Sequence, residues 1–199
     1  MRIVVGVTGA SGVILAEYLL RTLRESGCET QLLITDAART TWAAECDRPL
    51  SDLIQAADRL YDNADLAAAI ASGSYAVDGM VILPCSMKTL AGVVSGYSET
   101  LLLRAADVTL KEGRTLILCP RESPLSRVHL RNLQEAGELG CVIMPPLLTF
   151  YHRPRTWEEM AEAYVGRIAA RLGVKTEKNI VWTGLPEPHG KGDTDGKNS

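Results

Sequence analysis

The sequence predicts an α/β fold in which a mostly parallel sheet is covered by helices on both faces. Short runs of Val, Ile and Leu alternate with longer amphipathic stretches of helical period, which is the order of β–α units. The short runs lack polar alternation, as expected of strands that are buried on both sides. With 199 residues, of which 46% are hydrophobic and 23% charged, the chain has the make-up of one globular domain with a sizeable core.

Five short apolar runs are the expected strands. Each is rich in Val, Ile or Leu without intervening polar residues at every second position, so we expect helices on both faces of the sheet that they form. In chain order, the expected strands are residues 2–7, 30–34, 79–83, 115–119 and 141–144.

Five amphipathic stretches are the expected helices. Two of them carry readable caps, because Thr156 precedes Glu159 by three positions and Ser126 stands at the start of another helical run. Each cap offers an acceptor for a backbone amide that has no partner in the first turn. In chain order, the expected helices are residues 12–24, 65–72, 101–112, 126–138 and 156–172.

Charge and hydropathy argue against several classes of protein. The formal net charge of -3 gives no reason to expect nucleic acid or an anionic membrane as partner, because either would call for clustered positive charge. No apolar stretch approaches the roughly 20 residues that span a bilayer. The apolar run at the N-terminus is too short for the core of a signal peptide, so we expect a cytoplasmic protein.

The chain is expected to form a single α/β domain over residues 1–175, with a C-terminal extension over residues 176–199. The last ten residues, 190–199, are mostly Gly, Lys, Asp and Asn and offer almost nothing to bury. We therefore expect residues 190–199 to be disordered.

The cysteines and histidines do not indicate a metal site or a nucleophilic triad. The five cysteines are widely scattered without a Cys-x-x-Cys pair, and no His stands at metal-ligand spacing. We expect Cys119 and Cys141 to be buried thiols. His129, His152 and His189 are expected to be structural or solvated, since none belongs to a recognisable catalytic arrangement.

Several polar or glycine-rich segments follow the expected strands. The carboxyl ends of parallel strands share one edge of the sheet, and ligands bind in the crevice above that edge. We therefore expect these segments to form a shared site although they lie far apart in the sequence. They are residues 9–12, Thr35 with Asp36, residues 85–89, Arg121 with Glu122, and Pro145 with Pro146.

The turn after the first strand reads GVTGASG over residues 6–12. Free amides at a helix start favour a phosphate, and the Thr8 and Ser11 hydroxyls add donors. A tight turn without a ligand is the plainer alternative. A short-chain dehydrogenase is not supported, because Val13 and Leu15 replace the next glycines of that motif and no Tyr is followed four positions later by Lys.

The segment PCSMKTLAG over residues 84–92 ends a buried strand in hydroxyls and one cation. Such a loop can donate hydrogen bonds to a ligand, or it can simply be a helix cap beside a solvated Lys88. Cys85 is a poor candidate nucleophile, because no His stands near it in the sequence and apolar neighbours indicate burial.

Charged residues concentrate in three further segments. Arg104 and Lys111 are seven positions apart and can share a helix face, either to hold a phosphate or as an exposed face of an interface helix. The pair Arg121–Glu122 follows a buried strand and lies between prolines, which places it at the expected ligand edge. The third segment, FYHRP, covers residues 150–154.

Six segments together closely resemble the UbiX-like flavin prenyltransferases, over about residues 2–171. The chain is most similar to the members that accompany hydroxyarylic-acid decarboxylases, which share its WTGLP ending at residues 182–186. The matching segments, in order, are GASG at residues 9–12, PCSMKTLA at 84–91, RAAD at 104–107 with LKE at 110–112, PRE at 120–122, MPP at 144–146 and FYHRP at 150–154.

The resemblance implies a Rossmann-like flavoprotein fold with three layers and a site between subunits. It implies a homo-oligomer built from trimers, commonly a dodecamer. Reduced FMN would be the acceptor, and a UbiD-like decarboxylase would receive the product. Thr35 departs from the Ser usual in the family, which keeps the hydroxyl but stiffens the side chain. The implied FMN contacts are Gly9, Ala10, Ser11, Thr35, Ser86, Met87, Lys88, Thr89 and Arg121.

The resemblance also implies the donor side of the site, where dimethylallyl phosphate would bind without a metal. Ser11, Glu45 and Glu122 match positions linked to proton movements, and Trp182 matches one that covers the site. The implied ligands of the donor phosphate are Lys111, Tyr151 and Arg167, with Arg104 and Glu122 near it.

Two other functions compete with flavin prenyl transfer. One is an FMN-dependent decarboxylase of peptidyl-cysteine type, but the His and the Asn-bearing loop of those enzymes have no match in this sequence. The other is a non-catalytic subunit of a hydroxyarylic-acid decarboxylase.

Overall fold

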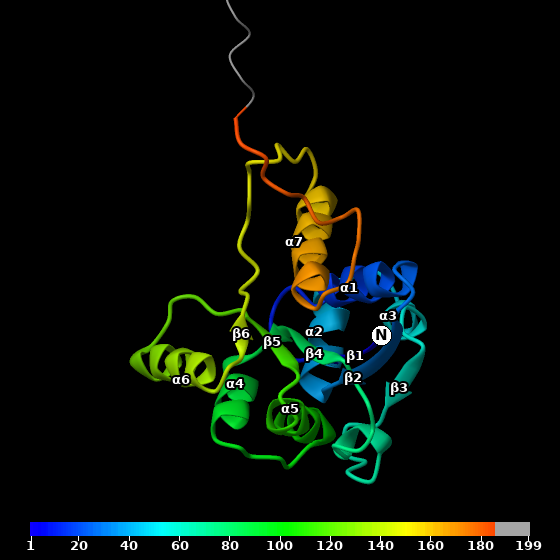
Figure 1. The fold of residues 1–199 in the computed structure, drawn as a ribbon, viewed down its shortest axis with the longest axis vertical. Helices are drawn as coiled ribbons and strands as arrows, with labels where there is room; N and C mark the ends of the chain where they lie inside the picture. The colour runs from blue at the N-terminus through cyan, green and yellow to red at the C-terminus, as the bar shows by residue number, and fades with distance from the viewer. Residues whose placement is uncertain (186–199) are drawn as a thin grey trace, which may run out of the picture.

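The structure, a computed structural model, describes residues 1–185. Within these residues, six strands form one sheet in the order β3-β2-β1-β4-β5-β6 (Figure 1). The strands are β1 (Arg2–Val7), β2 (Glu29–Ile34), β3 (Arg59–Tyr61), β4 (Gly79–Cys85), β5 (Thr115–Pro120) and β6 (Val142–Ile143). The helices are α1 (Ile14–Glu25), α2 (Asp36–Glu45), α3 (Leu50–Gln55), α4 (Met87–Val94), α5 (Leu101–Lys111), α6 (Arg127–Glu138) and α7 (Trp157–Arg171), with one 3-10 turn, η1 (Ala69–Ala71).

Every neighbouring pair of strands is parallel. The chain builds outward from β1 to β2 and β3, returns to place β4 on the other side of β1, and then builds outward again to β5 and β6. The direction of building therefore reverses between β1 and β4. In parallel sheets, the crevice at such a reversal is where ligands bind.

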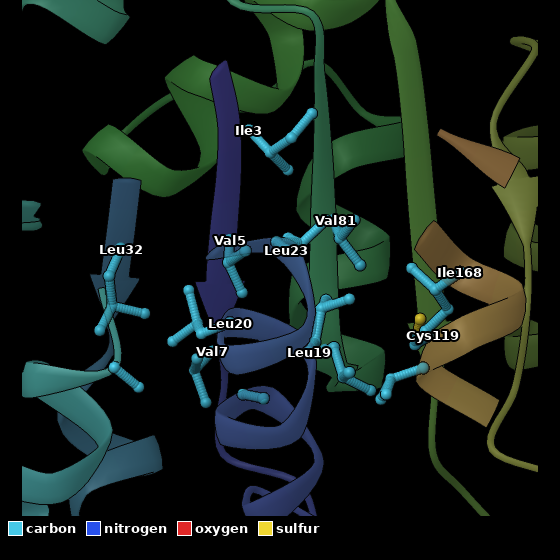
Figure 2. Close-up of a cluster of buried hydrophobic side chains, with 14 of the residues drawn as sticks. Ile3, Val5, Val7, Leu19, Leu20, Leu23, Leu32, Val81, Cys119 and Ile168 are labelled. Atoms are coloured by element: carbon cyan, nitrogen blue, oxygen red, sulfur yellow. The ribbon is translucent and has the colours of Figure 1, made fainter. Parts of the chain in front are cut away.

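Two apolar clusters lie on opposite faces of the sheet, which explains why the strands read as continuous apolar runs. Ile3, Val5 and Val7 of β1 face one cluster, whereas Val4 faces the other. Figure 2 shows the first cluster, in which these β1 side chains pack against Leu19, Leu20 and Leu23 of α1, with Ile168 of α7 nearby. The second cluster is covered by α4 and α5 (Figure 1).

The expected α/β class, all five expected strands and four of the five expected helices are confirmed. The caps are confirmed as well: Thr156 accepts a hydrogen bond from the Glu159 amide at 3.2 Å, and Ser126 accepts one from the His129 amide at 3.2 Å. The ring of His129 accepts in return from the Ser126 amide at 3.3 Å, so this histidine is structural. The start of α1 moves to Ile14 because Gly12 takes a φ of 93°.

The prediction of a helix over residues 65–72 is wrong, because only the 3-10 turn η1 forms there. The Asp62 side chain accepts a hydrogen bond from the Ala64 amide at 3.0 Å, and the Asp65 side chain accepts one from the Ala67 amide at 3.0 Å. Aspartates that bond to nearby amides in this way hold turns and compete with helix. Strand β3 and helices α2, α3 and α4 were not among the expected elements, although a helix cap was one alternative for the segment that holds α4. Strand β3 and helix α3 are too short for a periodic signal.

The segment after α7 returns along that helix (Figure 1). Gly166 permits this close approach, since a methyl group there would overlap the carbonyl of Lys178 and lie 2.8 Å from the Asn179 amide nitrogen. The Lys178 ammonium also pairs with Glu25 at 3.0 Å and with Glu162 at 3.5 Å. The expected disorder of residues 190–199 and the Pro186 of the C-terminal motif lie outside the described residues.

No helix within residues 1–185 has both the length and the apolar character needed to cross a membrane.

Candidate functional site

The ends of three neighbouring strands are tied together at the expected ligand edge. The Thr8 hydroxyl donates to the Pro84 carbonyl at 2.8 Å and accepts a hydrogen bond from the Ser86 amide at 2.8 Å. On the far side of β4, the Arg121 amide donates to the Cys85 carbonyl at 3.2 Å. The turns after β1, β4 and β5 are thus one continuous rim, as the strand order requires.

A cavity of about 750 Å³ opens at this rim between α2, α4 and α6. Five of the residues expected to contact the cofactor line it: Gly9, Thr35, Ser86, Lys88 and Thr89. Ala10, Ser11, Met87 and Arg121 belong to the same turns but do not line this cavity.

The starts of α2, α4 and α5 line the cavity, and those of α2 and α4, which lie next to the glycine turn, each have a hydroxyl cap. Thr35 accepts a hydrogen bond from the Ala38 amide at 3.2 Å at the start of α2. Ser86 accepts one from the Thr89 amide at 3.3 Å at the start of α4, and its hydroxyl lies 3.0 Å from that of Thr89. The capped-helix interpretation of the segment after Ser86 is therefore correct. Two helix dipoles directed at one cavity favour a bound anion such as a phosphate.

Gly9 is required by the close approach of α2 to the first turn. A methyl group on Gly9 would overlap the Ala37 side chain and lie 3.0 Å from the Ala37 carbonyl carbon. Within the turn, the Ala10 amide donates to the Thr8 carbonyl at 2.8 Å and the Gly12 amide donates to the Glu45 carboxylate at 2.8 Å. A ligand at this turn would therefore be met by the other amides. The glycine turn, the two helix starts and the hydroxyls fit the phosphate end of a mononucleotide.

Glu45 reaches the same turn from the opposite end of α2. Its carboxylate accepts a hydrogen bond from the Gly12 amide at 2.8 Å, which brings it beside Ser11. Glu45 also lines a second cavity, of about 700 Å³, between α1 and α7. Sequence reasoning missed this cavity, whose walls include the Tyr18–Trp157 edge-on ring pair and the buried Glu17, held by Arg48.

Arg121 and Glu122 are exposed immediately after β5, as expected. The Glu122 carboxylate accepts a hydrogen bond from the Ser123 amide at 3.0 Å, which keeps it within its own loop. Both residues therefore lie at the ligand edge, on the side of β5.

Arg104 and Lys111 share one face of α5, as their spacing predicted, but that face is directed at residues 71–73. Arg104 donates to the Ala71 carbonyl at 3.1 Å and pairs with Asp107 at 2.6 Å. Lys111 pairs with Glu112 beside Gly73. Because α5 ends just before β5 begins, Lys111 lies at the amino-terminal edge of the sheet, opposite the rim that carries Gly9.

The residues expected to bind the donor from the C-terminal part lie on an arm formed by α7 and the segments before and after it (Figure 1). The Tyr151 hydroxyl donates to the Ile180 carbonyl at 3.2 Å, and its ring meets Trp182 edge-on at 6.0 Å. Arg167 lines a smaller cavity of about 450 Å³ together with Asn179. The segment 179–182 thus contacts Tyr151 through Ile180 and Trp182, and it lines the same cavity as Arg167 through Asn179.

The buried thiols are confirmed and carry no sign of reactivity. Burial raises the pKa of Cys119 to about 12 and that of Cys141 to about 11. Burial raises the pKa of Cys85 as well, so a thiolate at this position is strongly disfavoured. Among the described residues, no group of three or more His, Cys, Asp or Glu side chains is placed to hold a metal ion.

Asn63 is a cavity residue that sequence reasoning missed. It caps α5, since its side chain accepts a hydrogen bond from the Leu102 amide at 2.9 Å and its carbonyl accepts one from the Leu101 amide at 2.9 Å. Its only sequence signal is the turn-forming run DNAD over residues 62–65. That signal predicts a turn but not its place beside the ligand edge.

The parallel sheet and a rim built from a glycine turn and two capped helix starts define a nucleotide-binding protein of the flavoprotein class. The family model described as Flavoprotein matches residues 1–168. A probable UbiX-like flavin prenyltransferase of Sedimentibacter hydroxybenzoicus is 50% identical over 188 residues, which are 94% of this chain and 100% of that protein. The chain therefore belongs to the Flavoprotein family and, within it, to the UbiX-like flavin prenyltransferases.

Two solved structures support the same placement. The crystal structure of AnUbiX (PadA1) in complex with FMN and dimethylallyl pyrophosphate has a TM-score of 0.90 and 41% identity, and it covers 93% of this chain and 98% of that one. The crystal structure of a dodecameric FMN-dependent UbiX-like decarboxylase from Escherichia coli O157:H7 has a TM-score of 0.89 and 43% identity. The match covers 92% of this chain and 100% of that one.

Proposed function

We propose that this chain transfers a dimethylallyl group from dimethylallyl phosphate to reduced FMN and so makes prenylated FMN. The observation that carries the proposal is the rim of Gly9, Thr35 and Ser86 on a fold that matches a relative crystallised with FMN and dimethylallyl pyrophosphate. In the reaction, the allylic carbon–oxygen bond breaks, the phosphate leaves with the electron pair, and the carbon bonds to the flavin. The bound reduced flavin supplies the nucleophile.

The cavity at the rim is the proposed flavin-binding site, within a flavin-binding domain over residues 1–175. The amides of the glycine turn and of the starts of α2 and α4 bind the phosphate, and the Ser86 and Thr89 hydroxyls add donors. Ala10, Ser11, Met87 and Arg121 complete the proposed contacts from the same turns. Five of the nine proposed contact residues line one cavity, which supports this assignment.

The donor phosphate is proposed to be held by Lys111, Tyr151 and Arg167, with Arg104 near it. Negative charge grows on the departing phosphate, and cations fixed in a site that excludes water stabilise it most when it is fully developed. These side chains are therefore proposed to position the donor and to stabilise the charge on its phosphate, without a metal. Trp182, which meets the Tyr151 ring, is proposed to cover this half of the site.

The proposed donor residues reach the rim only if several copies of the chain combine. Lys111 lies at the opposite edge of the sheet, and Tyr151 lies on the arm. The arm exposes large apolar side chains, among them Leu147 at 70% and Phe150 at 64%, which is typical of a surface that another subunit covers. We therefore propose a homo-oligomer built from trimers, with a dodecamer as the complete assembly, consistent with the dodecameric relative.

Proton movements at the flavin are assigned to Ser11, Glu45 and Glu122. The hydrogen bond from the Gly12 amide to Glu45 supports this assignment, because it holds the carboxylate beside the turn that carries Ser11. Glu122 is exposed at the end of the neighbouring strand. The product is proposed to pass to a UbiD-like aromatic-acid decarboxylase.

The test is the mass of the flavin after incubation of the full chain with reduced FMN and dimethylallyl phosphate without oxygen. We expect flavin heavier by one prenyl unit, and we expect an Arg167→Ala variant to yield unmodified flavin. Unmodified flavin from the native chain, under conditions in which a known relative is active, would refute the proposal. Full activation of a partner decarboxylase by Arg167→Ala would instead favour a non-catalytic subunit.

A further inference from the structure

Residues 71–75, here called the 71–75 loop, connect η1 to the approach of β4 at the amino-terminal edge of the sheet. Two arginines hold the carbonyls of this loop. Arg104, on α5, donates to the Ala71 carbonyl at 3.1 Å. Arg114, just beyond α5, donates to the Gly73 carbonyl at 2.7 Å and to the Tyr75 carbonyl at 3.2 Å. The loop is therefore fixed relative to α5 at three points.

The same loop is anchored to the sheet through the ring of Tyr75. The buried Gln31 side chain, on β2, donates to the Tyr75 hydroxyl at 2.8 Å. The guanidinium carbon of Arg2, on β1, lies 4.5 Å from the centre of the Tyr75 ring, within the range of a cation–π contact. Because both α5 and the sheet hold it, the loop presents a rigid backbone to whatever packs on it.

Lys111 and Glu112 pack where a side chain of residue 73 would otherwise be. A methyl group on Gly73 would overlap a Glu112 carboxylate oxygen and lie 2.7 Å from its carboxyl carbon and 2.8 Å from the Lys111 nitrogen. Gly73 is not among the glycines with positive φ, so its backbone admits alanine. The need for glycine therefore comes from the space that the ion pair occupies and not from the backbone conformation.

We propose that the 71–75 loop, with Gly73 at its centre, positions Lys111 for the phosphate of the donor. The bare backbone at Gly73 lets the Glu112 carboxylate lie against the loop, and the carboxylate holds the Lys111 ammonium in one place. This inference rests on the proposed function, in which Lys111 is a phosphate ligand. It makes Gly73, Glu112 and Arg114 positioning residues, none of which touches the donor.

A methyl group at position 73 displaces only the flexible ends of two side chains, so the fold is retained. The Glu112 oxygen, which the added methyl overlaps, must move by about 1 Å or more, and the Lys111 ammonium, at 2.8 Å from the methyl, must shift as well. Misplacement on this scale weakens a contact that depends on geometry. We expect Gly73→Ala to weaken the affinity for dimethylallyl phosphate about tenfold, the size of one lost charge-assisted hydrogen bond, and to leave the affinity for FMN unchanged.

The experiment measures donor affinity by calorimetry on the assembled protein loaded with oxidised FMN, in which no transfer occurs. It compares the native chain, Gly73→Ala, Lys111→Ala, the double variant and Gly137→Ala. The last is a matched control on α6, where an added methyl would meet only the Ile143 side chain at 4.0 Å. We expect Gly73→Ala to weaken donor binding only when Lys111 is present, because a residue that acts through Lys111 has no effect once Lys111 is gone.

Three outcomes would overturn the inference. If Lys111→Ala weakens donor binding while Gly73→Ala matches the native chain, the proposed function stands and the positioning role falls. The positioning role also falls if the losses of donor affinity in Gly73→Ala and Lys111→Ala add in the double variant. If Lys111→Ala leaves donor binding intact, the proposed role of Lys111 fails first and the inference fails with it.

A second variant keeps the test informative if Gly73→Ala does not fold. Arg114→Lys keeps the charge but cannot hold the Gly73 and Tyr75 carbonyls together, because only the guanidinium presents a planar fork of donors. We expect a several-fold loss of donor affinity that disappears in the Lys111→Ala background. Unchanged affinity in Arg114→Lys would show that the loop does not set the position of Lys111.

Discussion

Glu45, the last residue of α2, accepts a hydrogen bond from the Gly12 amide at 2.8 Å. At the other end of α2, Thr35 caps the helix beside the cavity at the rim. Both ends of one helix therefore contact the candidate site, and the helix length fixes the spacing between its capped start and the Glu45 carboxylate. The positive φ of Gly12 turns its amide toward that carboxylate, which few other residues would permit.

This contact predicts the behaviour of a Glu45→Gln variant. The amide oxygen of Gln still accepts from Gly12, so the free energy of unfolding should change by less than about 1 kcal/mol. The proton-transfer capacity is lost, so the rate of prenylated-flavin formation should fall about a hundredfold. Single-turnover formation of the product, followed by mass spectrometry, measures this rate. A native rate in Glu45→Gln would remove Glu45 from the proton-transfer assignment.

Gly9→Ala should abolish tight FMN binding. The added methyl overlaps Ala37 and lies 3.0 Å from its carbonyl carbon, so the start of α2 must shift at a cost of about 1–3 kcal/mol in unfolding free energy. Quenching of flavin fluorescence on binding gives the affinity for FMN. A Gly9→Ala/Ala37→Gly chain removes the overlapping side chain, and it should recover part of the binding. Full FMN affinity in Gly9→Ala alone would contradict the proposed flavin-binding site.

Thr8→Val should destabilise the rim while nearly preserving volume. The buried hydroxyl donates to Pro84 and accepts from the Ser86 amide, and its loss leaves the amide without a partner, at a cost of about 1–3 kcal/mol in unfolding free energy. Thr8→Ser keeps the hydroxyl and is the matched control. Denaturant unfolding monitored by circular dichroism distinguishes the two, and equal stability of the two variants would show that the hydrogen bonds contribute little.

The convergence of Gly9, Ser86 and Arg121 was predictable from sequence, because a strand order that places parallel neighbours together also gathers their carboxyl ends. The location of Lys111 was not predicted. Helical spacing placed it on a face with Arg104, but the edge of the sheet at which a helix ends depends on the order of strands around it. The roles of Thr8 and Gly73 depend on contacts with residues 76 and 38 positions away, which local patterns do not encode.

Stability should fall in alkaline solution because of the buried thiols. Burial raises the pKa of Cys119 to about 12, whereas an unfolded thiol titrates near about 8.5. Above the unfolded value, the unfolded chain loses a proton that the folded chain keeps, so stability declines with pH until the folded pKa is reached. Cys119→Ala should reduce that decline by about 1.4 kcal/mol per pH unit between roughly pH 9 and 11. Equal slopes for the native and variant chains, from denaturant unfolding at several pH values, would exclude this contribution.

Gly166→Ala tests whether the C-terminal segment must lie on α7. Helix propensity alone predicts a gain of about 1 kcal/mol, since alanine replaces glycine inside a helix. The structure predicts the opposite effect on the packing of the C-terminal segment. The new methyl overlaps the Lys178 carbonyl and lies 2.8 Å from the Asn179 amide nitrogen. Backbone atoms cannot yield as a side-chain tip does, so the segment must lift from the helix.

Lifting the segment would move Ile180 and Trp182 away from Tyr151, which they contact through a hydrogen bond at 3.2 Å and an edge-on ring pair. The expected result in Gly166→Ala is faster tryptic cleavage after Lys175 and Lys178, together with weaker donor binding and native FMN affinity. Gly137→Ala, in the open position on α6, should show none of these changes. If Gly166→Ala resists trypsin as the native chain does and binds the donor equally well, close packing of residues 178–182 on α7 is not needed to build the donor half of the site.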